Sequence, residues 1–311
     1  MNFWKNLKKP IMVLAPLADV TDPAFRSIIA KYGKPDVMWT EFVSADGLFM
    51  GGYEHLIKDL AYTEAERPIV AQFFSSKPEM MKRAAELACD LGFDGVDINM
   101  GCPDKSVEKQ GSGAAHIKDF KQAEEIILAT MEGAQKNGKN LPVSVKTRIG
   151  YNKNQLEERL PALLETNPAV VTIHARTRKE MSLVPARWEY IRRAVEIRDC
   201  FVDSTGKKSQ TLIFGNGDVV DTDDGRRKCE ETGCDGVMLG RAIFGNPFLF
   251  HHSYEGWNKN GSEVREKFLR ERLRVMVEHT KLFEELLPHK SFAIMNSELQ
   301  NSQTSHFFTY S

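Results

Sequence analysis

GVDINMGCPDKSVEKQGSGAA, residues 95–115, passes from a short apolar strand into a polar loop. Apolar and polar residues alternate from Gly95 to Met100, which is the period of a half-buried β-strand. Three glycines and a proline then occur within residues 101–113, and they predict irregular structure for about a dozen residues. A loop of that length inside a compact domain is typical of a lid or a binding loop. The stretch therefore predicts a strand whose carboxyl end carries a functional loop.

Cys102 lies in this loop, between Gly101 and Pro103, and the sequence leaves two interpretations of it. A free intracellular thiol without a paired cysteine commonly packs as a small apolar group. A thiol at the carboxyl end of a strand is instead presented to a site, and its unperturbed pKa of about 8.5 keeps it mostly protonated near neutral pH. Cys102 is therefore a candidate proton donor as well as a candidate nucleophile.

The composition indicates one large domain, or one large and one small domain. Of the 311 residues, 41% are hydrophobic and 27% are charged, as in ordinary globular proteins. The N-terminal apolar run is short and is interrupted by Pro16, so we expect neither a signal peptide nor a membrane span. The five cysteines form no CxxC pair, which predicts a cytoplasmic protein without a metal site. Because the net charge is -1, a nucleic-acid partner would have to be bound by local patches.

Eight short apolar runs alternate with amphipathic helical patterns along the first 250 residues. The predicted strands are Ile11–Ala15, Val37–Val43, Pro68–Phe74, Gly95–Met100, Pro142–Arg148, Val170–Ala175, Thr211–Gly215 and Gly236–Leu239. The predicted helices are Pro23–Tyr32, Glu79–Leu91, Phe120–Asn137, Gln155–Glu165, Trp188–Arg198 and Thr222–Glu231. This alternation predicts an α/β protein with a (β/α)8 TIM barrel over residues 1–250, although a doubly wound sheet has the same periodicity.

A small helical domain is expected over residues 251–311. Glu263–Glu285 has a helical period. The predicted apolar stripe consists of Val264, Phe268, Leu273, Val275, Met276 and Leu282. The basic residues Arg265, Lys267, Arg270, Arg272 and Arg274 form either a solvated face or a surface for a phosphate backbone. The tail from Asn296 is polar and lacks a helical period, so we expect it to be disordered.

Polar or turn-forming residues follow nearly every predicted strand. The active residues of a TIM barrel lie at the carboxyl ends of its strands. Taken strand by strand, the candidates are Ala15, Pro16 and Leu17 after the first, Gln72 in the third, Asn99 and Cys102 at the fourth, Lys146 and Arg148 at the fifth, His174 and Arg176 at the sixth, Asn216, Gly217 and Asp218 at the seventh, and Gly240 and Arg241 at the eighth. We expect these residues to surround one site.

The loops after the seventh and eighth strands predict a phosphate site. Glycines in Gly215–Asp218 and at Gly240 would let backbone N–H groups approach an anion, and Arg241 can bind phosphate oxygens with two N–H groups.

Lys146 in an apolar strand needs an anion or must lose its charge. It is a strand-end lysine reaching water, a Schiff-base lysine or a cation beside an electron-rich ring. His174 is either a core histidine or a donor to a cofactor or substrate.

Seven short motifs occur in a fixed order over about residues 11–250. They are LAPLADVTD (Leu14–Asp22), VAQF (Val70–Phe73), DINMGCP (Asp97–Pro103), VKTR (Val145–Arg148), IHAR (Ile173–Arg176), GNGD (Gly215–Asp218) and Gly240-Arg241. Together they resemble the tRNA-dihydrouridine synthase family, and the Asn-x-Gly-Cys-Pro element joined to Lys-x-Arg and His-x-Arg strands is specific to it. The resemblance implies a flavin barrel with a C-terminal helical domain. Such a protein would use FMN and NADPH to reduce the C5–C6 double bond of particular uridines in tRNA.

The resemblance also implies a role for each candidate residue. Cys102 would be the acid that protonates C5 of the uracil, and Asn99 and Arg148 would orient the flipped base. Arg176, with Arg178 and Lys179, would bind the substrate through the RNA backbone. For FMN, Ala15, Pro16 and Leu17 would line the flavin, Gln72 and Lys146 would contact its ring, and His174, Asn216, Gly217, Asp218, Gly240 and Arg241 would hold its phosphate end.

The C-terminal tail departs from the family pattern and keeps alternatives open. Family members usually continue past the position of Phe292 with a basic, aromatic helical segment, so the helical domain is expected to be truncated or altered from about Asn296. One alternative is a flavin barrel that reduces a small pyrimidine-like molecule. A second is an aldolase or isomerase in which Lys146 forms a Schiff base, and a third is a degenerate member that binds tRNA without reducing it. With tRNA as the partner, we expect a cytoplasmic monomer without a membrane or metal partner.

Overall fold

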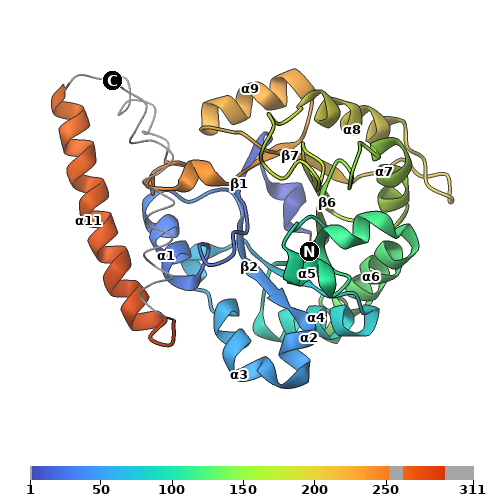
Figure 1. The fold of residues 1–311 in the computed structure, drawn as a ribbon, viewed down its shortest axis with the longest axis horizontal. Helices are drawn as coiled ribbons and strands as arrows, with labels where there is room; N and C mark the ends of the chain where they lie inside the picture. Colours follow the sequence, from blue (N-terminus) through green and yellow to red (C-terminus); the bar gives the residue numbers. More distant parts are fainter. Residues whose placement is uncertain (1, 252–261, 291–311) are drawn as a thin grey trace.

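The core of the protein is a sheet of eight parallel strands (Figure 1), and the computed structural model describes residues 2–251 and 262–290. The strands are β1 (Ile11–Leu14), β2 (Met38–Ser44), β3 (Ile69–Phe74), β4 (Gly95–Asn99), β5 (Val143–Arg148), β6 (Val170–His174), β7 (Leu212–Asn216) and β8 (Gly236–Leu239). Strands β2 to β8 pair in sequence order, and β1 pairs with β8. A parallel bridge from Val13 to Val37 joins β1 to the start of β2. The ring is therefore closed, which confirms the TIM barrel and excludes the doubly wound sheet.

Helices on the connections between strands cover the outside of the barrel. The long ones are α1 (Pro23–Tyr32), α4 (Pro78–Leu91), α6 (Phe120–Gly133), α7 (Leu156–Glu165), α8 (Glu189–Cys200) and α9 (Thr222–Thr232). After β2 the chain forms short pieces instead, namely α2 (Ala45–Gly47), a π-helical turn (Leu48–Gly52), α3 (Tyr53–Leu56) and two 3-10 turns (Ile57–Leu60 and Glu64–Glu66). The predicted helix ending at Asn137 is too long, because α6 ends at Gly133 and Asn137 has a left-handed φ of 55°.

Local sequence sets the ends of several helices. Asp22, Asp119 and Asp221 precede α1, α6 and α9, and each carboxylate accepts a hydrogen bond from the backbone N–H three residues later. Such caps stabilise a helix by about 1 kcal/mol. At the other end, α4 and α9 stop at Gly92 and Gly233, whose φ values of 80° and 76° are easily adopted by glycine.

The loop after β4 contains two short helices, so the expectation of irregular structure there is wrong. They are α5 (Lys105–Lys109) and a 3-10 helix (Gly113–Lys118). Asp104 begins α5 because its carboxylate accepts a hydrogen bond of 2.7 Å from the N–H of Ser106. Gly111 lies between the two helices and Gly113 begins the second, so no glycine interrupts α5 and the glycine-rich loop can still hold helical turns.

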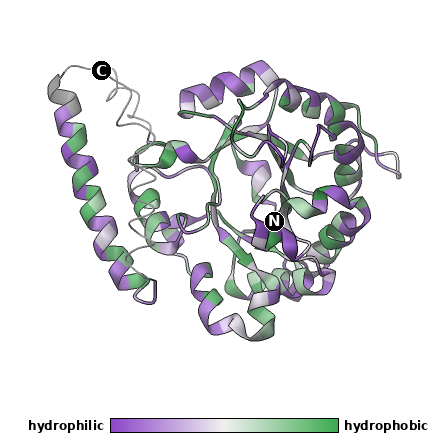
Figure 2. Cartoon of the chain, viewed as in Figure 1, coloured by the Kyte–Doolittle hydropathy of each residue, from purple (hydrophilic) through white to green (hydrophobic). Residues whose placement is uncertain are grey.

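Aromatic side chains close the N-terminal end of the barrel. Trp4, from a 3-10 turn at Phe3–Asn6, contacts Trp39 of β2 and Phe214 of β7, with ring centroids 5.9 Å and 5.5 Å away. These rings belong to a buried apolar cluster inside the barrel, whereas a larger cluster lies between strands and helices. Figure 2 shows the strands of the barrel in mostly hydrophobic colours, with hydrophilic residues concentrated on the outer helices. Because side chains fill the N-terminal end of the barrel, the space for a site lies at the opposite end, where the strands have their carboxyl ends.

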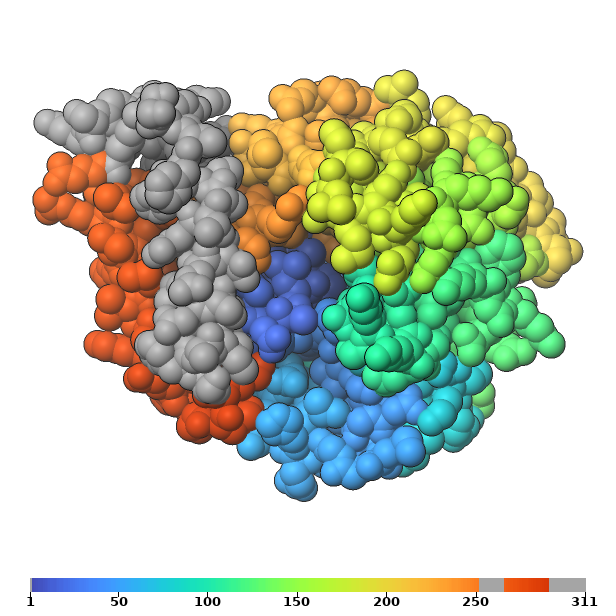
Figure 3. Space-filling model, viewed as in Figure 1, coloured from blue at the N-terminus to red at the C-terminus, as the bar shows by residue number. Residues whose placement is uncertain are grey.

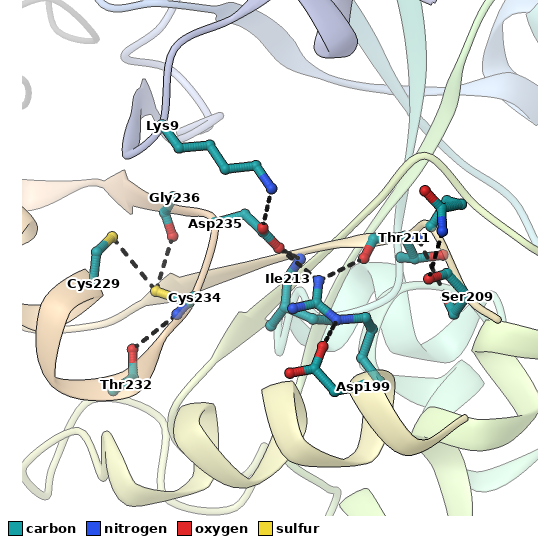
Figure 4. A network of polar contacts seen from close by, with 12 residues as sticks. Lys9, Asp199, Ser209, Thr211, Ile213, Cys229, Thr232, Cys234, Asp235 and Gly236 are labelled. Carbon is teal, nitrogen blue, oxygen red and sulfur yellow. Dashed lines mark hydrogen bonds and ion pairs between the residues drawn. The ribbon is translucent and has the colours of Figure 1, made fainter. Parts of the chain in front are cut away.

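A buried carboxylate ties several segments together at this N-terminal end (Figure 4). Asp235, just before β8, accepts hydrogen bonds from Lys9 at 2.6 Å, Arg198 of α8 at 2.8 Å and the N–H of Ile213 at 2.8 Å. Asp235 therefore joins the start of the chain to β7, β8 and α8. The thiols of Cys229 and Cys234 lie nearby with their sulfur atoms 3.6 Å apart.

The long helix α11 (Ser262–Leu286) lies beside α1 (Figure 1). Its residues Phe283 and Val275 are buried against Ala24 and Ile28 of α1. Lys31 of α1 donates a hydrogen bond of 2.6 Å to Glu278. The predicted helix is thus confirmed for Ser262–Leu286, and no helix of the described part of the chain is long and apolar enough to cross a membrane.

The predicted apolar stripe of this helix is partly wrong. Leu273 and Met276 are 49% and 38% exposed, and neither belongs to the cluster that α11 forms with α1. Val275 is buried beside Ile28 of α1, and Phe268 and Leu282 are half-buried around it, so this part of the stripe is confirmed. The predicted polar tail from Asn296 lies outside the described residues.

Candidate active site

A cavity of about 790 Å³ opens at the carboxyl ends of the strands. In Figure 3 the mouth is a hollow near the middle of the molecule, with the dark-blue N-terminal part of the chain at its floor. Its volume is within the usual range for cofactor and substrate sites. All the candidate residues predicted from the sequence line it: Ala15, Pro16, Leu17, Gln72, Asn99, Cys102, Lys146, Arg148, His174, Arg176, Asn216, Gly217, Asp218, Gly240 and Arg241. The prediction that these residues surround one cavity is therefore confirmed.

Cys102 lies just beyond β4, where the loop turns into the cavity. Burial raises the pKa of its thiol, so the sulfur is protonated at neutral pH. The carbonyl of Cys102 accepts a hydrogen bond of 2.9 Å from the N–H of Ala114. Gly113 packs so closely that a Cβ atom there would lie 2.8 Å from that carbonyl oxygen. The loop thus presents a protonated thiol on a backbone fixed by its own second half.

Asn99 connects the Cys102 loop to the interior of the barrel. Its side-chain oxygen accepts hydrogen bonds from the N–H groups of Gly101 at 3.1 Å and Cys102 at 2.9 Å. Its amide nitrogen donates to Gln72 of β3 at 3.2 Å, and Gln72 in turn donates to Asp97 of β4 at 2.5 Å. The side chains of Asn99, Gln72 and Asp97 are all at least 95% buried. Two predicted residues, Asn99 and Gln72, are therefore hydrogen-bonded to each other, and Gln72 joins them to Asp97, which was not predicted as a site residue.

Arg148 at the end of β5 fixes two loops at once. Its guanidinium donates to the carbonyl of Gly101 at 2.7 Å and to the carbonyls of Thr177 and Met181 in the loop after β6 at 3.3 Å and 3.1 Å. Burial lowers the pKa of Arg148 to about 10, so it remains a cation at neutral pH. Arg148 therefore supports the loop that carries Cys102.

Lys146 lies two residues before Arg148 on β5 and lines the cavity. Its pKa is lowered to about 8, first by burial and then by the positive charge of Arg148. Asp97, whose own pKa is raised by burial to about 6, partly opposes this shift. Two buried cations with one buried carboxylate leave an excess of positive charge here, which an anionic ligand would neutralise.

The predicted phosphate loops converge at the other side of the cavity. Asp218 binds both Arg176 and Arg241, the second at 3.0 Å. Burial alone would raise the pKa of Asp218, but the two arginines and the N–H of Ala186 lower it. Arg176 also contacts the ring of His174 at 3.1 Å. The structure thus places Arg176, predicted as a substrate residue, in contact with Asp218 and His174, two residues of the predicted phosphate site.

His174 is neutral in this cluster. Burial and the nearby cations, Arg148 first among them, move its pKa well below the ordinary value. Gly217 packs against its ring, where a Cβ atom would be 3.1 Å from the imidazole, and has a φ of 123°. At Gly240, in contrast, a Cβ would have its nearest neighbour, Ala15, at 3.7 Å. The backbone of Gly240 is therefore open to the cavity, as expected where an anion approaches N–H groups.

Asp97 and several cavity-lining residues were not predicted. Phe42, Ser182 and Met238 also line the cavity. Asp97 had a signal in the sequence, because a carboxylate in an apolar strand is costly unless hydrogen-bonded. Phe42 and Met238 had none, since an apolar residue in a strand is equally suited to packing.

The fold is a closed TIM barrel, and its cavity contains a thiol, a buried lysine and two arginines, Arg176 and Arg241, that both bind Asp218. These features define a barrel enzyme. Solved structures with the same fold include morphinone reductase (TM-score 0.55, 12% identity, 79% of this chain and 86% of that chain) and a variant of NCR from Zymomonas mobilis (0.51, 15%, 80% and 87%). At these identities the likeness concerns the fold alone.

Sequence relatives identify the family. The dihydrouridine synthase (Dus) family model matches residues 13–306. A probable tRNA-dihydrouridine synthase of Staphylococcus aureus (strain MRSA252) is 38% identical over 91% of this chain and 80% of its own length. Probable tRNA-dihydrouridine synthase 2 of Bacillus subtilis (strain 168) is 39% identical over 93% and 84%. The chain belongs to the dihydrouridine synthase family.

Proposed function

We propose that the protein reduces the C5–C6 double bond of particular uridines in tRNA to dihydrouridine, with bound FMN and with NADPH as the reductant. The observation that carries the proposal is that Cys102, the buried Lys146 and the two arginines Arg176 and Arg241 all line one cavity. The names of the relatives, probable tRNA-dihydrouridine synthases, support the substrate.

The cavity residues fit FMN. The open backbone at Gly240 and the cations Arg176 and Arg241 would hold the phosphate, while Ala15, Pro16 and Leu17 line the apolar part of the cavity. Gln72 and Lys146 would face the flavin ring, and the positive charge of Lys146 would stabilise negative charge on the reduced ring. Bound FMN, once reduced by NADPH, would supply the hydride for C6 of the uracil.

The remaining steps fall to side chains of this chain. The protonated Cys102 thiol donates its proton to C5 of the base, and its raised pKa keeps it in the acid form. Asn99 and Arg148 keep the loop that carries the thiol in place through the N–H groups of Gly101 and Cys102 and the carbonyl of Gly101. The target base must leave its stack to enter the cavity.

Binding of tRNA would rest on the mouth of the barrel and on α11. The basic side chains of α11 are partly neutralised, since Arg270 pairs with Glu266 at 2.7 Å and Arg274 with Glu271 at 2.8 Å. Lys179, in the loop after β6, is exposed and would contact the phosphate backbone without breaking a pair. We therefore assign more of the RNA contact to the mouth than the sequence indicated.

The visible spectrum of the purified protein, followed by NADPH oxidation with and without unmodified tRNA, tests the proposal. A flavin spectrum with tRNA-dependent oxidation is expected. Oxidation that responds to free uridine and not to tRNA would establish a small-molecule reductase instead. A protein that stays colourless with added FMN, and whose Lys146 is trapped by borohydride with a carbonyl compound, would replace the flavin by Schiff-base chemistry.

A further inference from the structure

We propose that Asp97 is a positioning residue: it anchors a hydrogen-bond chain through Gln72 and Asn99 that holds the Cys102 loop and fixes the orientation of the Gln72 amide in the cavity. The inference rests on the proposed function for its catalytic meaning. Its structural content can be tested on the protein without any cofactor.

The two ends of the chain force its direction. A carboxylate such as Asp97 only accepts hydrogen bonds, and the backbone N–H groups of Gly101 and Cys102 only donate them. Between these ends lie two amides, Gln72 and Asn99, each of which can face either way. Gln72 must present its NH2 group to Asp97, so its oxygen faces Asn99. Asn99 must then present its NH2 group to Gln72 and its oxygen to the loop, and both ends therefore demand the same arrangement.

The chain is buried along its whole length. Asp97, Gln72 and Asn99 are 1%, 0% and 5% exposed. The register places Gln72, Asp97 and Ser144 side by side on β3, β4 and β5, and the hydroxyl of Ser144 donates to the second oxygen of Asp97. Water therefore does not compete at the anchor, and a lost partner there leaves a buried donor unsatisfied.

The anchor matters for the cavity because Gln72 and Asn99 both line it. Gln72 uses one N–H group for Asp97 and its oxygen for Asn99. Its second N–H group is thereby directed away from Asp97, and the amide presents a fixed edge to a ligand. A rotated Gln72 would instead place its oxygen against the carboxylate of Asp97, which repels it.

The deciding measurement is the rate at which iodoacetamide alkylates Cys102 in the cofactor-free protein. It is made in a Cys200→Ser background, because Cys200 is the exposed thiol among the cysteines that the structure describes. Asp97→Leu removes the anchor without removing volume. We expect it to accelerate alkylation of Cys102 by about fivefold, the equivalent of one lost hydrogen bond of about 1 kcal/mol.

Two further variants separate positioning from general loss of stability. Asp97→Asn keeps an acceptor for Gln72 and can donate to Ser144, so alkylation should stay within about twofold of the parent rate. Asp235→Asn weakens a buried carboxylate cluster at the opposite end of the barrel (Figure 4). It should lower the melting temperature and leave the alkylation rate unchanged. If Asp97→Leu does not fold, Gln72→Leu breaks the same chain one link nearer the loop and should have the same effect.

An unchanged or slower rate in the leucine variants overturns the proposal, as does an equal acceleration in Asp235→Asn. FMN affinity, measured by quenching of flavin fluorescence, provides a separate result. A several-fold weaker affinity in Asp97→Leu, restored in Asp97→Asn, is expected if Gln72 contacts the ring. Failure of every variant and of the parent to bind FMN would refute the proposed function while the alkylation rates still decide the role of Asp97.

Discussion

Buried ionisable side chains give the cavity its chemical character. Lys146 and Arg148 remain cations although burial lowers their pKa values to about 8 and about 10, while Cys102 and His174 are kept neutral. The cavity thus combines fixed positive charge with an uncharged acid. This combination suits a reaction in which negative charge develops on a substrate and a proton follows.

At this scale we expect Cys102→Ala to slow reduction of tRNA in a single turnover by about 10²- to 10⁴-fold, the usual contribution of a positioned acid. FMN binding should be unchanged, because the substitution removes a proton donor and leaves the phosphate loops intact. Stopped-flow loss of the reduced-flavin signal measures the rate. Cys200→Ala, at an exposed position, is the control, and a wild-type rate in Cys102→Ala would contradict the role as acid.

The sequence predicted which residues line the cavity better than it predicted which side chains those residues contact. Asn99, Arg148 and His174 end strands and Cys102 follows one, so the barrel geometry alone brings them together. The position of Arg176 beside Asp218 was not predictable, because it depends on two loops that are 42 residues apart. Asp97 was passed over because alternation in a strand does not tell which polar side chain faces the interior of a closed barrel.

At the scale of elements, the segment after α11 is fastened to the mouth of the barrel. Lys290 lies 3.2 Å from Glu41 of β2 and 3.3 Å from Asp59. Burial raises the pKa of Glu41 to about 7, and Lys290 opposes that shift. Because the pKa of Glu41 is raised on folding, its contribution to stability is lost as the pH rises through about 7, and Lys290 limits the loss.

We therefore expect Lys290→Met to lower the free energy of unfolding by about 1–3 kcal/mol at pH 8, since a buried carboxylate loses its partner. At pH 6 the loss should be smaller, because Glu41 is largely protonated in both proteins. Urea unfolding at the two pH values measures the difference. Lys281→Met, at an exposed position of α11, is the control, and an equal loss at both pH values would contradict the coupling to Glu41.

The long helices and strands were predicted within a few residues, but the short helices were not. Elements such as α5 have too few residues to show a period, and a side-chain cap such as that of Asp104 decides them. Likewise, the helical period of α11 could be read from the sequence. The exposure of Leu273 could not, because it depends on which face of α11 packs against α1.

At the scale of the whole molecule, Asp235 helps to close the ring. Burial alone would raise the pKa of Asp235, but Lys9, the N–H of Ile213 and Arg198 together lower it. A carboxylate whose pKa is lowered on folding contributes stability above its unfolded pKa of about 3.9, and that contribution is lost as the pH falls below it.

We expect Asp235→Asn to lower the free energy of unfolding by about 3 kcal/mol at pH 7, as when one partner of a buried ion pair is removed. The difference from wild type should narrow below about pH 4, where the wild-type carboxylate also becomes protonated. Thermal unfolding over this pH range measures it. A constant difference across the range would show that charge does not matter at this position.

The pairing of β1 with β8 also has a consequence for how the chain matures on the ribosome. Lys9 and Asp235 are 226 residues apart, and translation at about 5–20 residues per second separates their synthesis by roughly 10–45 s. During that interval β1 cannot pair with β8, because β8 has not yet been synthesised. Nascent chains stopped before residue 236 should therefore remain sensitive to protease near their N-terminus, and resistance should appear once β8 has left the exit tunnel.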